Sequence, residues 1–132
     1  MNPGRNVMII ALFLMLNISG SGQGLTISTG TILETTGGNM VLQGNVVNDG
    51  SFINANSTIV FSGNTQVISG TTPISFNNIT VDPGSTTTLT TPGQTLNGIL
   101  LCNGTFNANG NFTLLSTEYQ TALIDGSGTG QV

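Results

Sequence analysis

The feature that most constrains this chain is how soon each run of strand-forming residues is interrupted. From residue 25 onward, pieces of two to four residues rich in Val, Ile, Thr and Phe alternate with turn-forming Gly, Asn, Asp, Pro and Ser. β-branched and aromatic residues favour strands. Gly is too frequent for helices, and no apolar set recurs at the three-to-four spacing of a helix. The region after residue 24 is therefore predicted to be all-β.

Fifteen pieces of this kind can be marked as expected strands. They are Leu25–Ile27, Thr31–Leu33, Met40–Leu42, Asn45–Val47, Ser51–Ile53, Thr58–Phe61, Gln66–Ile68, Ile74–Phe76, Ile79–Val81, Thr88–Thr90, Thr95–Leu96, Ile99–Leu101, Thr105–Phe106, Phe112–Leu115 and Ala122–Ile124. Strands in globular proteins are commonly about 5–6 residues long. Hairpins made of these shorter strands would bury little apolar surface. Three strands per coil, each stacked on the strand one coil earlier, suit them better. We predict a parallel β-helix (β-solenoid) of about five short coils, preceded by a signal-peptide helix.

An internal repeat supports a solenoid. Residues 42–52 align without gaps on residues 96–106, an offset of 54, with Leu, two Gly and Phe identical. Repetition at a fixed spacing is the sequence signature of stacked structural units. This offset corresponds to three coils of about 18 residues or two of about 27 residues, and the first agrees with three strands per coil.

A coil of this type encloses a narrow column of apolar side chains. Each contributes roughly 1.5–3 kcal/mol when fully buried, before conformational entropy is subtracted. The expected core side chains are Ile27, Leu42, Val47, Phe52, Ile59, Phe61, Ile68, Phe76, Ile79, Val81, Leu96, Leu101, Phe106 and Leu114.

The first residues have the three parts of a secretory signal peptide. Residues 1–6 carry one positive charge on Arg5, residues 7–16 are ten consecutive apolar residues, and residues 17–24 are small and polar. A membrane-spanning helix needs about 20 apolar residues, so ten are too few. We expect a signal peptide over 1–23, a solenoid domain over 24–124 and a Gly/Ser-rich linker over 125–132. The mature protein is then expected to be secreted or on the outer cell surface, delivered by the export machinery and not integral to a membrane.

The composition excludes several kinds of site. The chain has no His, so it cannot form a Ser-His-Asp or Cys-His nucleophilic site. Its single Cys, Cys102, cannot form a Cys/His zinc site by itself. No cation follows Arg5, which argues against binding to nucleic acid. Cys102 stands beside Leu100 and Leu101 and is expected to be a small buried apolar residue. We predict no enzyme activity and no catalytic, cofactor or metal site.

The acidic residues favour turns over catalysis. Glycosidases need two carboxylates about 5–10 Å apart, but Asp49 and Asp82 are separated in sequence and precede Gly50 and Pro83-Gly84. Asp at such positions caps its own backbone. The segment from Asp125 lacks the alternating acids of a calcium loop and is expected to be a flexible connection. The Thr-x-Thr pattern within residues 86–90 would suit an ice-binding solenoid, but it does not recur at the coil spacing.

One stretch resembles a known class of protein. Residues 59–89 are similar to a segment frequent in large exported adhesin-like surface proteins of gliding and environmental Gram-negative bacteria, many of them cargo of the type IX secretion system. The matching positions are Phe61, Gly63, Gln66, Ile68, Gly70, Pro73, Phe76, Asn78, Ile79 and Val81. The resemblance implies β-helical repeats and a C-terminal sorting domain. No sorting domain is recognisable here, so we expect a fragment of a longer protein.

These observations lead to a functional expectation. We expect a non-enzymatic structural or adhesion segment that acts as a rigid repeat scaffold and contacts surface glycans or other cell-surface components. The alternative is the N-terminal coils of a carbohydrate-active β-helix enzyme or of a carbohydrate-binding protein. An ice-binding solenoid is the third hypothesis.

Overall fold

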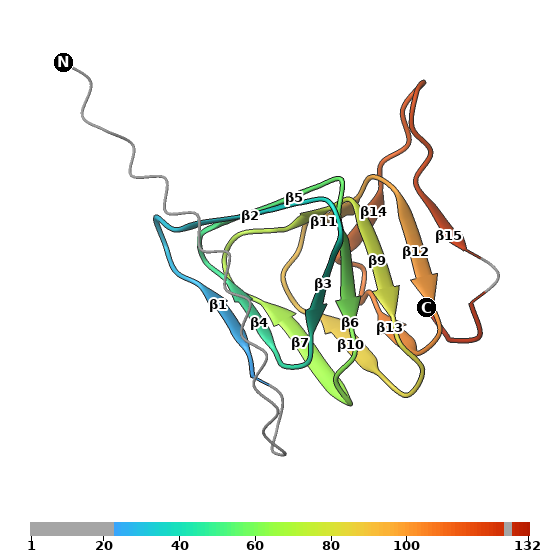
Figure 1. Ribbon diagram of the computed structural model, residues 1–132, viewed down its shortest axis with the longest axis horizontal. Coiled ribbons are helices and arrows are strands. Elements are labelled where there is room, and N and C mark those ends of the chain that lie inside the picture. The colour runs from blue at the N-terminus through green and yellow to red at the C-terminus, as the bar shows by residue number, and fades with distance from the viewer. Residues whose placement is uncertain (1–22, 126–127) are drawn as a thin grey trace.

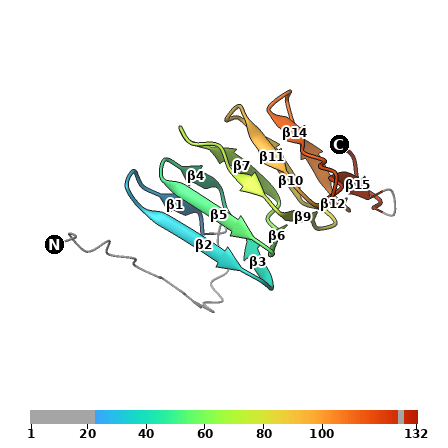
Figure 2. The same cartoon turned by 90° about the horizontal axis from the view of Figure 1, so that it is seen from above.

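The protein is a three-sided β-solenoid in which the chain winds through three parallel sheets. A computed structural model describes residues 23–125 and 128–132. Each sheet has five parallel strands, and neighbouring strands in a sheet are three positions apart in the chain. Figure 1 shows the coils side by side, and Figure 2 shows the same stack from above. The predicted all-β solenoid of about five coils is confirmed.

The three sheets take every third strand. Sheet A contains β1 (Leu25–Ile27), β4 (Val46–Asn48), β7 (Thr65–Ser69), β10 (Thr86–Leu89) and β13 (Thr105–Asn107). Sheet B contains β2 (Ile32–Thr36), β5 (Ser51–Ala55), β8 (Ser75–Phe76), β11 (Gln94–Leu96) and β14 (Phe112–Leu114). Sheet C contains β3 (Asn39–Leu42), β6 (Thr58–Phe61), β9 (Asn78–Val81), β12 (Ile99–Cys102) and β15 (Leu123–Asp125). Every one of the fifteen expected strands is present, with ends that differ by up to three residues.

The coil length expected from the repeat is wrong, because the coils are unequal and most are longer. Residues paired between the named strands lie between 18 positions apart (Gln94 with Phe112) and 24 positions apart (Ile99 with Leu123). The offset of 54 therefore relates different sheets: Leu42 lies on β3 of sheet C, whereas Leu96 lies on β11 of sheet B. The two aligned segments are eight strands apart, which is not a whole number of three-strand coils. The repeat describes one strand–turn–strand unit used twice, not one coil stacked on another.

Short turns join the sheets at the corners of the coil. At Asp82–Ser85 the Ser85 N–H donates to the Asp82 carbonyl at 3.0 Å, with Pro83 next and Gly84 at φ +80°. Pro followed by a residue of positive φ is the pattern of a type II turn. Gly63 serves a different purpose, because a Cβ there would overlap the carbonyl oxygen of Gln43 in the preceding coil. Glycine allows both the reversal of direction and the close stacking of corners.

The core is a single apolar column inside the three sheets. Its centre is fully buried and includes Phe61 and Phe76, whose rings pack edge to face with centroids 6.3 Å apart. The predicted core residues that are buried are Ile27, Leu42, Phe52, Ile59, Phe61, Ile68, Phe76, Ile79, Val81, Leu96 and Phe106. A column this narrow leaves each coil dependent on the side chains of its neighbours.

Three predicted core residues are not in the core. Val47 and Leu101 are half-buried, and the side chains that point inward are the preceding residues Val46 and Leu100. Alternate residues of a strand face opposite sides, so a shift of one position exchanges the two faces. Leu114 is 39% exposed on β14, at the end of sheet B, where it pairs only with β11.

The N-terminal predictions fall outside what the structure covers. The signal peptide expected over 1–23 and its helix lie, apart from residue 23, outside the described residues. In the described part of the chain, no helix has the length and apolarity needed to cross a membrane.

Candidate functional site

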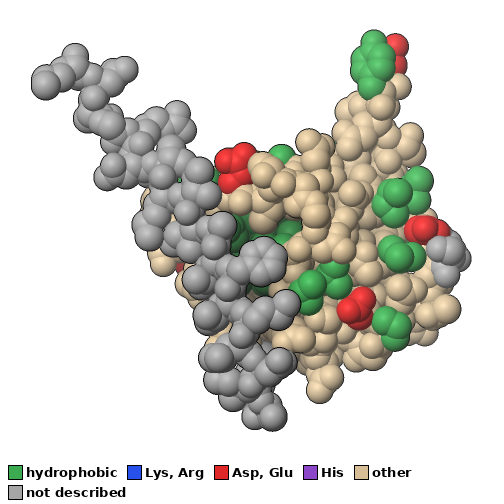
Figure 3. Space-filling model, viewed as in Figure 1, with side chains coloured by type: hydrophobic (Ala, Val, Ile, Leu, Met, Phe, Trp, Pro, Cys, Tyr) green, Lys and Arg blue, Asp and Glu red, His purple; other side chains and the backbone are tan. Residues whose placement is uncertain are grey.

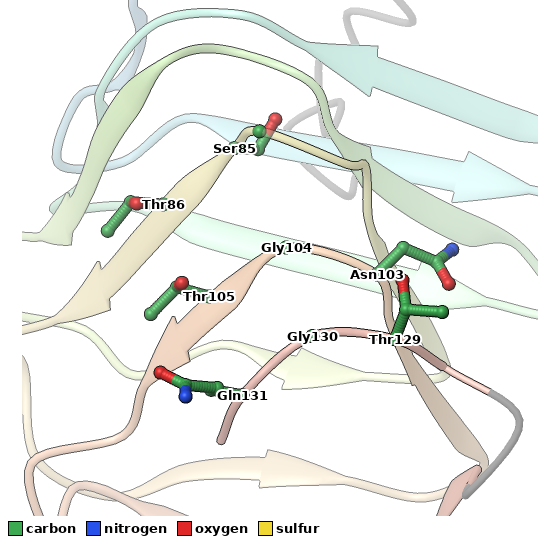
Figure 4. Close-up of a pocket in the computed structure, with 9 residues that line it drawn as sticks. Ser85, Thr86, Asn103, Gly104, Thr105, Thr129, Gly130 and Gln131 are labelled. Carbon is green, nitrogen blue, oxygen red and sulfur yellow. The ribbon is translucent and has the colours of Figure 1, made fainter.

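A shallow polar groove lies at the corner where sheet C leads into sheet A. It is lined by Gly84–Thr86, Asn103–Thr105 and Thr129–Gln131, and its volume is about 340 Å³. Figure 4 shows these three segments side by side, with Thr86, Thr105 and Gln131 on adjacent passes of the chain. We call this the corner groove.

Backbone pairing fixes the spacing of the groove walls. The Thr105 N–H donates to the Ser85 carbonyl at 2.8 Å, and the Gln131 N–H donates to the Gly104 carbonyl at 2.8 Å. Gln131 forms a parallel bridge with Thr105, so the last described residues continue sheet A past β13. A Cβ on Gly104 would overlap the carbonyls of Asp82 and Ser85, so this corner can close only around glycine.

The chemistry of the corner groove is neutral. Its side chains are hydroxyls and amides from Ser, Thr, Asn and Gln, and glycines expose backbone groups. Such groups donate and accept hydrogen bonds but do not supply a general acid, a base or a nucleophile activated by a neighbouring base. The arrangement suits hydroxylated, uncharged ligands or ordered water.

The two acids weighed as catalytic candidates lie at different corners. Asp49 is on the link from β4 to β5, where its carboxylate accepts hydrogen bonds from the Thr71 N–H at 2.9 Å and the Thr71 hydroxyl at 3.0 Å. Asp82 begins the type II turn between β9 and β10. Both are turn residues as expected, but the Asp49 side chain braces the next coil and not its own turn. The fold does not bring the two acids together.

Asp125, weighed as part of a calcium loop, lies at the end of a strand. Asp125 ends β15, and its carbonyl accepts from the Gly128 N–H at 3.3 Å. Among the described residues, no group of three or more His, Cys, Asp or Glu side chains could hold a metal ion.

Cys102 is buried, as the sequence predicts. Its thiol donates toward the carbonyl of Gln131 at 3.2 Å and toward that of Gly104 at 3.4 Å. Burial raises the pKa of the Cys102 thiol above its ordinary range, and the three backbone hydrogen bonds around the sulfur only partly offset that effect. A raised pKa keeps the sulfur as an unreactive thiol at neutral pH.

Sheet A shows a recurrence that the sequence had concealed. Thr86 pairs with Thr65 on one side and with Thr105 on the other, so three threonines form one outward column. The next outward column is Val67, Thr88 and Asn107, so among these strands of sheet A the Thr-x-Thr pattern occurs only on β10. The column escapes a fixed-period search because the step from Thr65 to Thr86 is longer than the step from Thr86 to Thr105.

A second feature that the sequence did not reveal is a projection between β14 and β15. It contains Tyr119, which is 91% exposed. The available signal was that the only Tyr of the chain lies in one of the longest stretches between two expected strands.

Comparison with known proteins adds no assignment. No family model matches the chain, and neither a curated protein nor a solved structure shows significant similarity to it.

Proposed function

We propose that this chain is a non-enzymatic structural and adhesion segment of a secreted or cell-surface protein. The observation that carries the proposal is the unbroken ladder of three parallel sheets around one core. Each coil is bonded to the next on three sides, so bending the stack would break backbone hydrogen bonds in more than one sheet. A rigid repeat scaffold provides reach and spacing without catalytic groups.

Export is supported by the sequence at the N-terminus and by the adhesin-like stretch. Residues 7–16 have the length of a signal-peptide apolar region, and residues 59–89 resemble a segment of exported adhesin-like proteins. From the same resemblance, we propose export by the type IX secretion system.

A fractionation experiment tests export. The full chain with a C-terminal tag is produced in a Gram-negative host, beside a Leu12→Arg variant whose apolar region is interrupted. We expect the wild-type chain outside the cytoplasm, cleaved between Gly20 and Gly24 by mass spectrometry, and the variant uncleaved inside. An uncleaved wild-type chain in the cytoplasm would overturn the proposal.

The competing function is carbohydrate cleavage by a β-helix enzyme. The separate positions of Asp49 and Asp82 argue against it, because acid–base hydrolysis of a glycosidic bond needs two nearby carboxyl groups. A turnover assay on polysaccharides, with Asp49→Asn and Asp82→Asn variants, distinguishes the two functions. Cleavage that either substitution abolishes would establish the enzyme and end the scaffold proposal.

A further inference from the structure

One loop breaks the otherwise even outline of the solenoid. Residues 115–122 connect β14 to β15, and they make the step between paired Ile99 and Leu123 the longest among the described strand pairs. Figure 1 shows this loop standing away from the stack beside β15. In Figure 3 the projection ends in a hydrophobic side chain next to an acidic one. We call residues 115–122 the Tyr119 finger.

Hydrogen bonds brace the finger at both its base and its tip. At the base, the Ser116 hydroxyl accepts from the Ala122 N–H at 3.1 Å. The same hydroxyl donates to the Ala122 carbonyl at 3.3 Å. At the tip, the Thr117 N–H donates to the Gln120 carbonyl at 2.6 Å, and the Thr117 hydroxyl accepts from the Gln120 N–H at 3.0 Å. The Tyr119 N–H also donates to that hydroxyl at 3.3 Å. The loop is thus ordered before it meets a partner, which lowers the entropy lost on binding.

The side chain on this braced tip has no role in the core. Tyr119 is 91% exposed, whereas the buried aromatic rings of the described chain are phenylalanines inside the column. A tyrosine ring gives a large, rigid contact area with few rotatable bonds, which is why tyrosine is common in binding sites. The neighbours of the ring on the finger are polar, and they include the exposed Glu118 and Gln120.

The chemistry of the tip favours a neutral sugar over other partners. The chain carries no cation after Arg5, so anionic partners such as nucleic acid or acidic glycans gain no charge attraction. A protein interface of ordinary size buries about 800 Å² on each partner. The tip of the finger, with one ring between polar residues, does not provide that area. The partly exposed apolar side chains Leu114, Leu115, Leu123 and Ile124 lie at the base of the finger and not at its tip. A pyranose needs less, namely an apolar plate for its C–H face and acceptors for its hydroxyl groups.

We propose that the Tyr119 finger is a contact site for neutral polysaccharide. The Tyr119 ring stacks on the C–H face of a sugar unit, and the Glu118 carboxylate accepts hydrogen bonds from its hydroxyl groups. The inference rests on the proposed extracellular location, because there the finger meets surface or environmental glycans. Weak single contacts become firm when many copies face a polymer.

The composition supplies a direct measurement. The chain has one Tyr and no Trp, so its tyrosine fluorescence reports Tyr119 alone. The full chain is titrated with soluble oligosaccharides from cellulose, chitin and starch, and in parallel it is sedimented with the insoluble polymers. We expect a saturable change in fluorescence and retention on at least one neutral polymer, with none on alginate, which is anionic.

Three variants separate stacking from structural effects. Tyr119→Ala is expected to weaken retention about tenfold or more, as for loss of an aromatic anchor. Tyr119→Phe keeps the ring and is expected to stay within a few-fold of the wild type. Val41→Ala, at another exposed apolar residue far from the finger, is the matched control and is expected to leave retention unchanged.

Other outcomes would overturn the inference. These are no retention on any neutral polymer, equal retention of the wild type and Tyr119→Ala, or retention on alginate equal to that on the neutral polymers. The experiment uses purified protein, so its failure leaves the export test unaffected, and a failure of export leaves the binding result standing.

Discussion

At the scale of single residues, buried polar side chains also join neighbouring coils, because they hydrogen-bond from one coil to the next. Gln66 is fully buried on β7, and its amide nitrogen donates to the carbonyls of Leu42 and Gly44, both at 2.9 Å. Its amide oxygen accepts from the Gly63 N–H at 2.9 Å. One side chain thereby bonds three backbone groups at this corner, of which the Leu42 carbonyl also accepts from the Ser62 N–H at 3.0 Å.

Replacing Gln66 should therefore be costly. Gln66→Leu keeps the volume but leaves the Gly63 N–H and the Gly44 carbonyl unpaired, while the Leu42 carbonyl keeps its bond from the Ser62 N–H. We expect the unfolding free energy to fall by about 2 kcal/mol or more. The matched control is Gln94→Leu. Gln94 is equally buried, but only its oxygen is bonded, to the Ile74 N–H at 2.8 Å, and its amide nitrogen has no partner among the described residues. We expect a smaller loss there, measured by urea denaturation. Equal losses would contradict the role given to Gln66.

Cys102 gives a prediction on pH. Its folded-state pKa is raised by burial, so the protonated thiol contributes stability that is complete below the ordinary thiol pKa. That contribution is lost as the pH rises through the folded-state pKa. We expect the wild type to lose more stability than Cys102→Ala between neutral and alkaline pH, as followed by denaturant midpoints. A parallel decline in the two proteins would argue against a buried neutral thiol.

At the scale of strands, the alternation of buried and outward residues decides how much unfolding free energy is lost when a side chain is shortened. On β12 the order is exposed, buried, half-buried, buried from Ile99 to Cys102. Leu100 pairs with Ile79 of β9, which is also fully buried, so the two side chains point into the same core. Leu101 pairs with Thr80 on the outer face.

Adjacent leucines therefore test the assignment of faces. Leu100→Ala is expected to lower the unfolding free energy by about 2–5 kcal/mol, the range for deleting a buried leucine side chain. Leu101→Ala changes the same chemistry one position away and is expected to cost clearly less. Thermal and chemical denaturation of the two variants gives the comparison. A larger loss for Leu101→Ala would mean that β12 faces the other way.

The strands themselves could be predicted, but their faces only in part. Short β-branched runs between turn residues located all fifteen strands. At Val46-Val47 and Leu100-Leu101, however, two apolar residues stand side by side, and either one could occupy the core. The neighbouring coil resolves the choice through its register, and that register depends on turn lengths that local sequence does not fix.

At the scale of the whole molecule, the solenoid is a one-dimensional stack. Within the described chain, β2 and β3 at one end and β14 and β15 at the other pair on one side only, whereas central strands pair on both. Stability of such a stack is approximately a sum of coil and interface contributions, so coils at the ends open more easily than coils in the middle.

Hydrogen exchange should record this gradient. β11 and β14 are neighbours in sheet B and have three residues each, but β11 is paired on both sides. We expect the amides of β11 and of the central strands β6 and β9 to exchange more slowly than those of β14 and β15, as measured by mass spectrometry. Uniform protection along the chain would indicate all-or-none unfolding of the stack.

The candidate surfaces could be predicted less well than the fold. The sequence excluded His-dependent nucleophilic sites and Cys/His zinc sites because it has no His and only one Cys, and it identified Asp49 and Asp82 as turn residues. It did not reveal the corner groove, since that groove joins segments distant in sequence whose alignment follows from backbone pairing. Nor did it reveal the column of Thr65, Thr86 and Thr105, since unequal turns disguise its period.

The sequence alone determined the class of fold, the number of strands and the absence of His and Lys side chains, because these follow from local propensity and composition. Tertiary structure alone decided which apolar residue of each pair faces inward, how long each coil is and which polar side chains meet across coils. Those outcomes depend on hydrogen bonds between strands a full coil apart in sequence, and a parallel ladder fixes them only when the whole stack has closed around its core.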